Sequence, residues 1–455
     1  MGIRKYEIDM SQGPILMKVI KFAIPLMLSN LLQVFYNAAD VIVVGRWAGN
    51  NALASVGATS SLFSLLVNFF AGFALGASVL VSRKYGAKDK EGLHRAVHTG
   101  MLVGLVAGVI AMTSGQIFRR PLLELMGTPA GEIIEGADLY LKIIFFGVPA
   151  TMTYNFGASV MRGVGDTRRP FYILMVTGVI NVLLNLLFVI KFEMGVAGVA
   201  IATTIANYLS AAAVIYFLMT SSGDYKLSIK KLRFYKAEII DVIKIGLPAG
   251  FQSSVYAIAN TVVQSGVNSF GDYAISGNAA AGNIESFIYQ AMNAFYQSTV
   301  TCVSQNYGAK KRDRLKKAIY VPAICAATVG AILGLLVVTF ARPLLSIYIT
   351  DSAKSLDFGA IRLYITILPY FMVGIMDVLC GAIRGLGRSS NTFINSLIGA
   401  CGFRIFWITC ILPMNRTPEM LFLCWPLSWF VVICLHIATL LMIWKKKISK
   451  ISYQE

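Results

Sequence analysis

The chain has 455 residues, of which 56% are hydrophobic and only 14% are charged. Soluble globular proteins carry about 25% charged residues, so the composition argues against a soluble enzyme and excludes a disordered or fibrous chain. The net charge of +18 comes from 40 Lys and Arg against 22 Asp and Glu. It fits either a nucleic-acid-binding protein or a membrane protein with basic cytoplasmic loops.

Twelve segments are long and apolar enough to cross a bilayer as helices, which takes roughly 20 mostly apolar residues. They fall at residues 19–45, 53–82, 94–117, 138–161, 170–190, 194–220, 240–269, 273–306, 316–340, 360–384, 391–413 and 417–444. The sequence therefore predicts an all-α membrane protein with twelve transmembrane helices and both termini on one side.

The basic residues indicate which side faces the cytoplasm. If both termini are cytoplasmic, 30 of the 40 Lys and Arg lie in or beside the inner segments, and 7 lie in the outer loops. This asymmetry is the positive-inside pattern, and it explains the basic charge without nucleic acid. We expect a multi-pass protein of the cell inner (plasma) membrane, surrounded by lipid and with no nucleic-acid partner.

The two halves of the chain are related by an internal repeat of about 222 residues. Four matches in chain order carry it: Pro25 with Pro248, residues 81–88 with 303–310, 118–123 with 340–345, and 162–165 with 384–387. Each half holds six spans, an even number, so the two repeats have the same orientation and are related by an axis along the membrane normal. We predict two lobes, 1–222 and 223–455. Duplicated twelve-span bundles are mainly transporters, so we favour transport over a duplication kept only for packing.

Acidic residues inside spans need a reason, because an acid at the bilayer centre costs about 2.5–3.5 kcal/mol. Asp40 and Asp377 are clear cases, and Glu285 is a third candidate. Asp377 has two interpretations. Either it faces a central cavity and attracts the positive end of a substrate, or it pairs with Arg404 of the next span and fixes the packing.

Asp40 lies at the same depth as polar residues of two later spans. Asn181 and Asn185 are four residues apart, on one face of span 5, and Thr203 lies in span 6. A carboxylate, two amide oxygens and a hydroxyl are hard ligands that suit Na⁺ or a hydrogen-bonded proton. The alternative is a network between helices, worth about 0.6 kcal/mol per contact.

Spans 7 and 8 carry polar side chains at every fourth position. The rows begin with Gln252, Tyr256, Asn260 and Gln264 on span 7 and with Glu285, Tyr289, Asn293 and Gln297 on span 8. Because amide side chains are disfavoured against lipid, we predict that both faces line a wet substrate cavity. Hydrogen bonding between helices is the alternative, and the tyrosines suit flat, apolar or cationic ligands.

Motifs for catalysis, nucleotides and metals do not occur. His94 and His98 are four residues apart but lack the Glu of a zinc-protease motif, and the chain has no phosphate-binding G-x-x-x-x-G-K-[ST] or nucleophile G-x-S-x-G sequence. We expect neither an enzyme nor a cofactor or metal.

On these residues the sequence resembles a bacterial MATE (multidrug and toxic compound extrusion) transporter, of the polysaccharide-flippase-related superfamily. The most specific pieces are Asp40 to Gly45, the motif 162–167 with its partner 384–387, and the Tyr-Gly-Ala-Lys segments at 85–88 and 307–310. The resemblance implies a secondary antiporter, which we expect to act as a monomer. It would export amphipathic, often cationic drugs or metabolites by alternating access while H⁺ or Na⁺ enters.

The resemblance also implies site residues. Asp40, Asn181, Asn185 and Thr203 fall on the family's cation site, but Asn185 stands where the family has a second acid, which favours H⁺ over Na⁺. Pro25 is the expected hinge of span 1. In the second half, Tyr256 occupies the place where a branch of the family has an acid in span 7. Asp377 lies about one turn from the position of the acid that the same branch has in span 10.

Two other functions remain open. A flippase for a lipid-linked precursor belongs to the same superfamily, and its cavity would need basic groups for a pyrophosphate. A sensor or channel-like membrane protein is the alternative from another class. The duplicated inner loops argue against it.

Both termini are predicted to be cytoplasmic because of the charge asymmetry. A cysteine introduced within 221–240 should resist an impermeant thiol reagent applied to intact cells and react after permeabilisation. A cysteine in the outer loop that holds Arg119 and Arg120 is the positive control. Labelling of the 221–240 cysteine from outside would overturn this topology.

Overall fold

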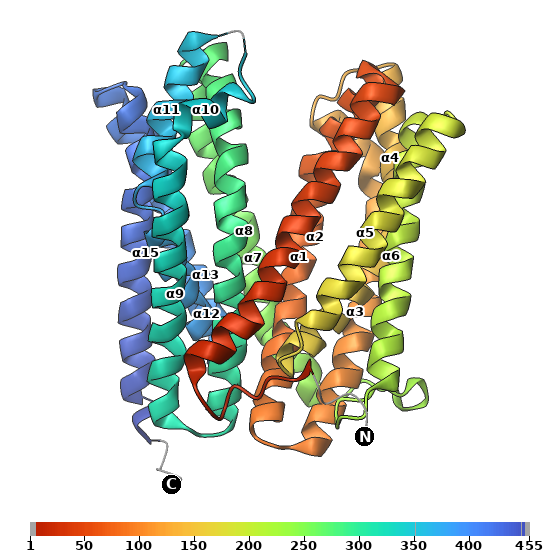
Figure 1. The fold of residues 1–455 in the computed structure, drawn as a ribbon, viewed down its shortest axis with the longest axis vertical. Helices are drawn as coiled ribbons and strands as arrows, with labels where there is room; N and C mark the ends of the chain where they lie inside the picture. The colour runs from red at the N-terminus through yellow and green to blue at the C-terminus, as the bar shows by residue number, and fades with distance from the viewer. Residues whose placement is uncertain (1–5, 351, 447, 451–455) are drawn as a thin grey trace. The chain divides into compact units, whose positions relative to one another are not determined.

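The computed structural model describes residues 6–350, 352–446 and 448–450, and this part of the chain is built from helices without any strand (Figure 1). The α-helices are α1 (Ile15–Val43), α2 (Asn50–Gly86), α3 (Lys90–Leu125), α4 (Glu132–Gly163), α5 (Arg168–Leu186), α6 (Gly195–Thr220), α7 (Lys236–Asn268), α8 (Asp272–Gly308), α9 (Arg312–Thr339), α10 (Ala341–Ser346), α11 (Ala353–Ile367), α12 (Phe371–Gly385), α13 (Ser389–Ser396), α14 (Phe403–Phe406) and α15 (Pro418–Lys446). Four π-helical turns extend or interrupt them: η2 (Val44–Ala48), η3 (Leu187–Lys191), η5 (Leu397–Gly402) and η6 (Trp407–Ile411).

These helices account for all twelve predicted spans. In the described part of the chain, eight helical segments are long and apolar enough to cross a membrane, and α11 with α12, bent by 49°, makes a ninth. The remaining three predicted spans correspond to α4, α7 and α8, which have 32, 33 and 37 residues. The prediction of an all-α fold with twelve spans in two sets of six is confirmed.

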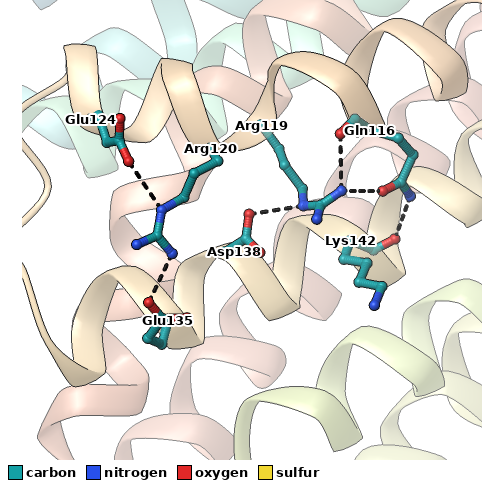
Figure 2. A network of polar contacts seen from close by, with 7 residues as sticks. All are labelled: Gln116, Arg119, Arg120, Glu124, Glu135, Asp138 and Lys142. Carbon is teal, nitrogen blue, oxygen red and sulfur yellow. Dashed lines mark hydrogen bonds and ion pairs between the residues drawn. The ribbon is translucent and has the colours of Figure 1, made fainter.

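The polarity of α4 is concentrated at its first turns, where it is tied to the end of α3 (Figure 2). Arg119 donates to Asp138 at 2.8 Å, and Arg120 donates to Glu135 at 2.8 Å. Gln116 donates to the backbone carbonyl of Lys142 at 2.7 Å. These charges therefore fix the α3–α4 end of the bundle.

The repeat seen in the sequence is also present in the contacts. Arg120 and Glu135 form an ion pair at 2.8 Å, and the residues 222 positions later, Arg342 and Asp357, form one at 2.8 Å as well. The loops that follow α2 and α8 each contain a lysine with a left-handed backbone, Lys88 at φ 54° and Lys310 at φ 56°.

Contacts divide the chain into two compact units. Unit 1 holds residues 1–9 and 28–250, and unit 2 holds residues 10–27 and 251–455. Both α1 and α7 therefore change unit within their length, in each case two residues after a proline, Pro25 or Pro248. The predicted lobes 1–222 and 223–455 follow the sequence repeat, and their boundary stays a prediction.

Each unit is built around one or two central helices. In unit 1, α4 packs against α2, α3 and α6. In unit 2, α8 packs against α9, α11 and α12, and α12 also contacts α9 and α15. The largest buried cluster of unit 1 joins α2, α3, α4 and α6 through side chains such as Val81, Phe156 and Val214.

Glycines allow the closest helix contacts in unit 1. A Cβ on Gly72 of α2 would lie 2.4 Å from the backbone nitrogen of Gly250 on α7, whereas a Cβ on Gly57 of the same helix would meet nothing within 4 Å. A methyl group on Gly72 would therefore meet the backbone of Gly250, and no flexible side chain is there that could move aside.

Gly72→Ala is expected to destabilise the protein, because α2 and α7 must separate to admit the methyl group. Overpacking of this kind costs about 1–3 kcal/mol. Gly57→Ala is the matched control and should hold or raise stability, since Ala is favoured over Gly in helices by up to about 1 kcal/mol. Thermal unfolding of the purified protein in detergent measures both, and equal melting temperatures for the two variants would contradict the packing argument.

Candidate functional site

Asp40 is joined to span 5 by hydrogen bonds in unit 1. The Nδ2 of Asn185 donates to Oδ1 of Asp40, and it also lies 3.4 Å from Oδ1 of Asn181. Asn181 in turn donates to the hydroxyl of Thr203 at 3.3 Å. The structure thus brings together all four residues of the predicted cation cluster.

The cluster contains one charge and an excess of acceptors. Asn181 and Asn185 are buried, with 5% and 0% of their surface exposed, and the Oδ1 of Asn185 is buried without any donor. Asp40 is half-buried and faces neutral partners. A buried acceptor without a donor is costly, so this geometry suits a proton or a cation that supplies the missing positive partner.

A change of helix geometry lies beside this cluster. Asp40 stands four residues before the π-helical turn η2, and Asn185 stands two residues before η3. π-Helical turns shift the direction of nearby side chains and are frequent at functional sites. They offer a local reason why these two polar groups meet.

The polar row of α7 contacts α12 and α13 within unit 2. Gln252 donates to the Ser396 hydroxyl at 2.7 Å and accepts from Arg384 at 2.7 Å. Ser396 also donates to the hydroxyl of Tyr256 at 3.2 Å. Arg384 further donates to the hydroxyl of Tyr296.

The row continues to a second arginine. Asn260 accepts from Nη1 of Arg404 at 2.8 Å, and Gln264 accepts from Asn278 of α8 at 2.9 Å. Asn260 itself is exposed, whereas Gln252 is buried. The α7 row therefore runs from the interior of unit 2 to an accessible face.

The α8 row begins with an ion pair. Glu285 accepts from Nη2 of Arg362 at 2.6 Å, with 15% and 6% of the two side chains exposed. Asn293 accepts from Gln297 at 3.3 Å, and Tyr289 is exposed. The charge of Glu285 is thus neutralised inside unit 2, and contact of this row with a substrate stays a prediction.

Asp377 does not form the pair with Arg404 that one interpretation required. Its Oδ2 is buried without a hydrogen-bond partner, and Arg404 donates instead to Ser428 at 3.1 Å and to Asn260. Arg384, two turns further along α12, donates to Tyr296 and Gln252. The pairing interpretation was wrong because a neutral amide and a hydroxyl took the place of the carboxylate.

Sequence reasoning missed several residues of this network. Arg362 lies within α11 and is buried, and its pairing with Glu285 was not predicted. Ser396, Tyr296 and Trp425 carried no signal, because single polar or aromatic residues in an apolar span are not distinctive. Arg384 belongs to the repeated motif 384–387, but its contacts with Gln252 and Tyr296 were not predicted.

Among the described residues no group of three or more His, Cys, Asp or Glu is placed to hold a metal ion. A monovalent cation or a proton would find its oxygen ligands at Asp40, Asn181, Asn185 and Thr203.

The chain matches a known family twice. A sequence model of the MatE family matches residues 25–187 and again residues 248–408. The two matches begin 223 residues apart, in agreement with the internal repeat. They cover more than half of the chain.

Relatives and solved structures agree with this match. The "Probable multidrug resistance protein YoeA" of Bacillus subtilis (strain 168) is 28% identical over 435 residues, 94% of this chain and 93% of that protein. The "Multidrug export protein MepA" of Staphylococcus saprophyticus is 21% identical over 93% of this chain and 92% of its own. The fold matches, with a TM-score of 0.89, a structure described as the outward-facing conformation of a multidrug resistance MATE family transporter, at 20% identity and 99% coverage of both chains.

Glu285→Gln is expected to lower stability strongly, because it leaves Arg362 buried without its counter-charge. Breaking a buried pair costs about 3–5 kcal/mol, and the remaining exposure of Glu285 puts the effect at the low end. Asp357→Asn is the matched control, an acid on α11, the helix of Arg362. The pair of Asp357 with Arg342 is 55% and 63% exposed, and such exposed pairs contribute about 0–1 kcal/mol. Equal melting temperatures for the two variants would show that the Glu285–Arg362 pair has no special weight.

Proposed function

Because the chain belongs to the MatE family of membrane transporters, we propose that it is a secondary active antiporter that exports amphipathic, often cationic compounds by alternating access. The proposed coupling ion is H⁺, with Na⁺ as the alternative. The observation that carries this proposal is Asp40, an acid inside a span whose hydrogen-bond partner is a neutral amide.

Asn185 can serve both protonation states of Asp40. Ionised Asp40 accepts a hydrogen bond from Nδ2 of Asn185, as in the structure. When Asp40 is protonated, a rotation of the amide presents Oδ1, the acceptor that now lacks a donor. An aspartate at position 185 would have no N–H to donate to ionised Asp40. Because Asn185 offers a donor to ionised Asp40 and an acceptor to protonated Asp40, the pair suits a proton better than Na⁺.

Protonation changes the cost of burying Asp40. It removes a charge whose partners are neutral, and burial of an uncompensated charge is expensive. The two states of Asp40 therefore favour different surroundings for α1. Pro25 interrupts the hydrogen bonding of that helix two residues before the boundary between the two units, which supports its proposed role as a hinge.

The membrane potential sets the scale of this drive. One charge crossing 100 mV supplies about 2.3 kcal/mol, and about 1.4 kcal/mol corresponds to a tenfold ratio. Each net positive charge that moves inward per exported molecule therefore supports roughly a fortyfold concentration gradient of the exported compound from the potential alone.

The setting of this transport follows from the charge distribution. We place the protein in the cell inner membrane with both termini in the cytoplasm, acting as a monomer on small-molecule substrates. The aromatic and amide groups of α7 and α8, with Asp377, are the proposed substrate contacts. The unpartnered Oδ2 of Asp377 supports this role, since it offers an acceptor to a cationic group.

Export by proteoliposomes under separately imposed gradients tests the coupling. The unaltered protein should export a cationic dye when a proton gradient is imposed, and only weakly under a sodium gradient alone. Asp40→Asn should abolish gradient-driven export, because it leaves the site neutral in every state. Asn185→Asp should gain response to sodium, because a second carboxylate strengthens Na⁺ binding.

Exchange of dye down its own concentration gradient, with no ion gradient imposed, is the control for folding, since a correctly folded variant still binds dye. Undiminished proton-driven export by Asp40→Asn would refute the assignment of Asp40. Robust export by the unaltered protein under sodium alone would refute the preference for H⁺.

A further inference from the structure

Two arginines of unit 2 lie against one tryptophan. The Cζ of Arg362 on α11 is 4.4 Å from the ring centroid of Trp425 on α15, and the Cζ of Arg404 on α14 is 5.8 Å from the same centroid. Both arginines are buried, with 5% and 4% of their surface exposed. Like charges gathered at one buried ring repel each other, so this arrangement needs an explanation beyond packing.

The hydrogen-bond donors of this group are incompletely matched. Arg362 donates to Asn278 at 2.7 Å and to Glu285 at 2.6 Å, yet its Nε is buried without an acceptor. Arg404 donates through Nε to Ser428 and through Nη1 to Asn260, and no described residue accepts from its Nη2.

Trp425 adds a third unmatched donor. Its Nε1 is buried and has no partner, whereas Trp407 of the same unit donates to the carbonyl of Met420 at 2.8 Å. Two buried donors from two helices, Nε of Arg362 and Nε1 of Trp425, thus lack acceptors around a single ring, and Nη2 of Arg404 is a third donor from which no described residue accepts. Unmatched buried donors are rare because each costs about 1–3 kcal/mol.

The charges are unbalanced as well. Glu285 neutralises Arg362, but the partners of Arg404 are a hydroxyl and an amide. Arginine stays protonated in proteins, so this positive charge cannot be removed by titration. An anionic oxygen would supply both the missing acceptor and the missing charge.

The position of the group in the repeat points to a ligand. An offset of 222 residues places Trp425 at the counterpart of Thr203 and Arg404 one residue from the counterpart of Asn181. Arg404 also lies between the π-helical turns η5 and η6, as Asn185 lies next to η3. The second repeat thus holds a positive cluster where the first repeat holds the Asp40 cluster.

The group also meets an accessible face of unit 2. Asn260, which accepts from Arg404, is exposed. On the other side, Gly282 of α8 leaves room for the guanidinium of Arg362, which a Cβ there would approach to 3.3 Å.

We propose that Arg404, Arg362 and Trp425, with Asn260, form a subsite that binds the carboxylate of an exported amphipathic aromatic compound. The inference rests on the proposed export function and narrows its substrate class to zwitterions. Arg404 supplies the charge and the free Nη2 donor, and Trp425 supplies a donor and an aromatic surface.

A matched pair of dyes tests the subsite without any gradient. Rhodamine 110 carries a free carboxylate, and its methyl ester carries the same xanthene cation without the acid. The purified full-length protein should bind the acid more tightly than the ester, as measured by fluorescence anisotropy. In Arg404→Gln this preference should fall by about tenfold, the effect of losing a charge-assisted hydrogen bond.

Three further variants define the cause. Arg404→Lys keeps the charge but loses the fork of donors, so it should keep part of the preference. Trp425→Phe keeps an aromatic ring and loses the Nε1–H donor, so the preference for the acid should fall by a few fold. This variant tests the subsite even where Arg404→Gln does not fold. Arg416→Gln is the control, because Arg416 is exposed and donates to the backbone of Ser269, and it should keep the full preference.

Equal preference in the unaltered protein, Arg404→Gln and Trp425→Phe would overturn the inference and leave the unmatched donors to internal water. Displacement of both dyes by a prenyl pyrophosphate, dependent on Arg404, would also overturn it and assign the group to a lipid headgroup. The transport proposal fails separately: absence of export under either gradient refutes it, whereas the binding preference can still be measured.

Discussion

A charge inside a bundle of membrane-spanning helices must find a partner, because neither lipid nor a packed apolar core can solvate it. This cost explains where the charged residues of the chain lie. Arg119 pairs with Asp138, and Arg120 with Glu135, in the first turns of α4, and Arg362 pairs with Glu285. Asp40, Arg384 and Arg404 differ from these pairs because their described hydrogen-bond partners are neutral, and Oδ2 of Asp377 has no partner. Their cost is tolerated where a proton, a cation or a ligand can offset it.

The local helix geometry lets these groups reach one another. In a regular α-helix successive side chains are rotated by about 100°, so the position of a residue in the helix fixes the direction in which its side chain points. The π-helical turns after Asp40 and Asn185 and on both sides of Arg404 change that direction. Each costs regular hydrogen bonding, and each stands beside a polar group that would otherwise face apolar neighbours. Backbone irregularity and buried polarity therefore occur together in both units.

Much of the fold could be predicted from the sequence, because the cost of burying polar groups acts on every residue of a span. Hydropathy located all twelve spans, including α8, where the polar row from Glu285 to Gln297 lowers the mean. The four residues around Asp40 could be grouped because their depths are equal. Partner choice in unit 2 could not be predicted. Whether Arg404 meets Asp377, Asn260 or Ser428 depends on rotations of α12, α14 and α15 that no local pattern records, and the π-helical turns have no sequence signature.

The two repeats share a backbone but differ in the charge of their interiors. The pairs Arg120–Glu135 and Arg342–Asp357 occupy equivalent positions, so duplication fixed the ends of both units alike. In the interior, the counterpart of Asp377 is Asn155, and the counterpart of Thr203 is Trp425. Unit 1 thus keeps an acid among amides, whereas unit 2 keeps three arginines, Arg362, Arg384 and Arg404, against two acids. In the transport that we propose, the acid of unit 1 serves the small cation and the charged interior of unit 2 serves the larger compound exchanged for it.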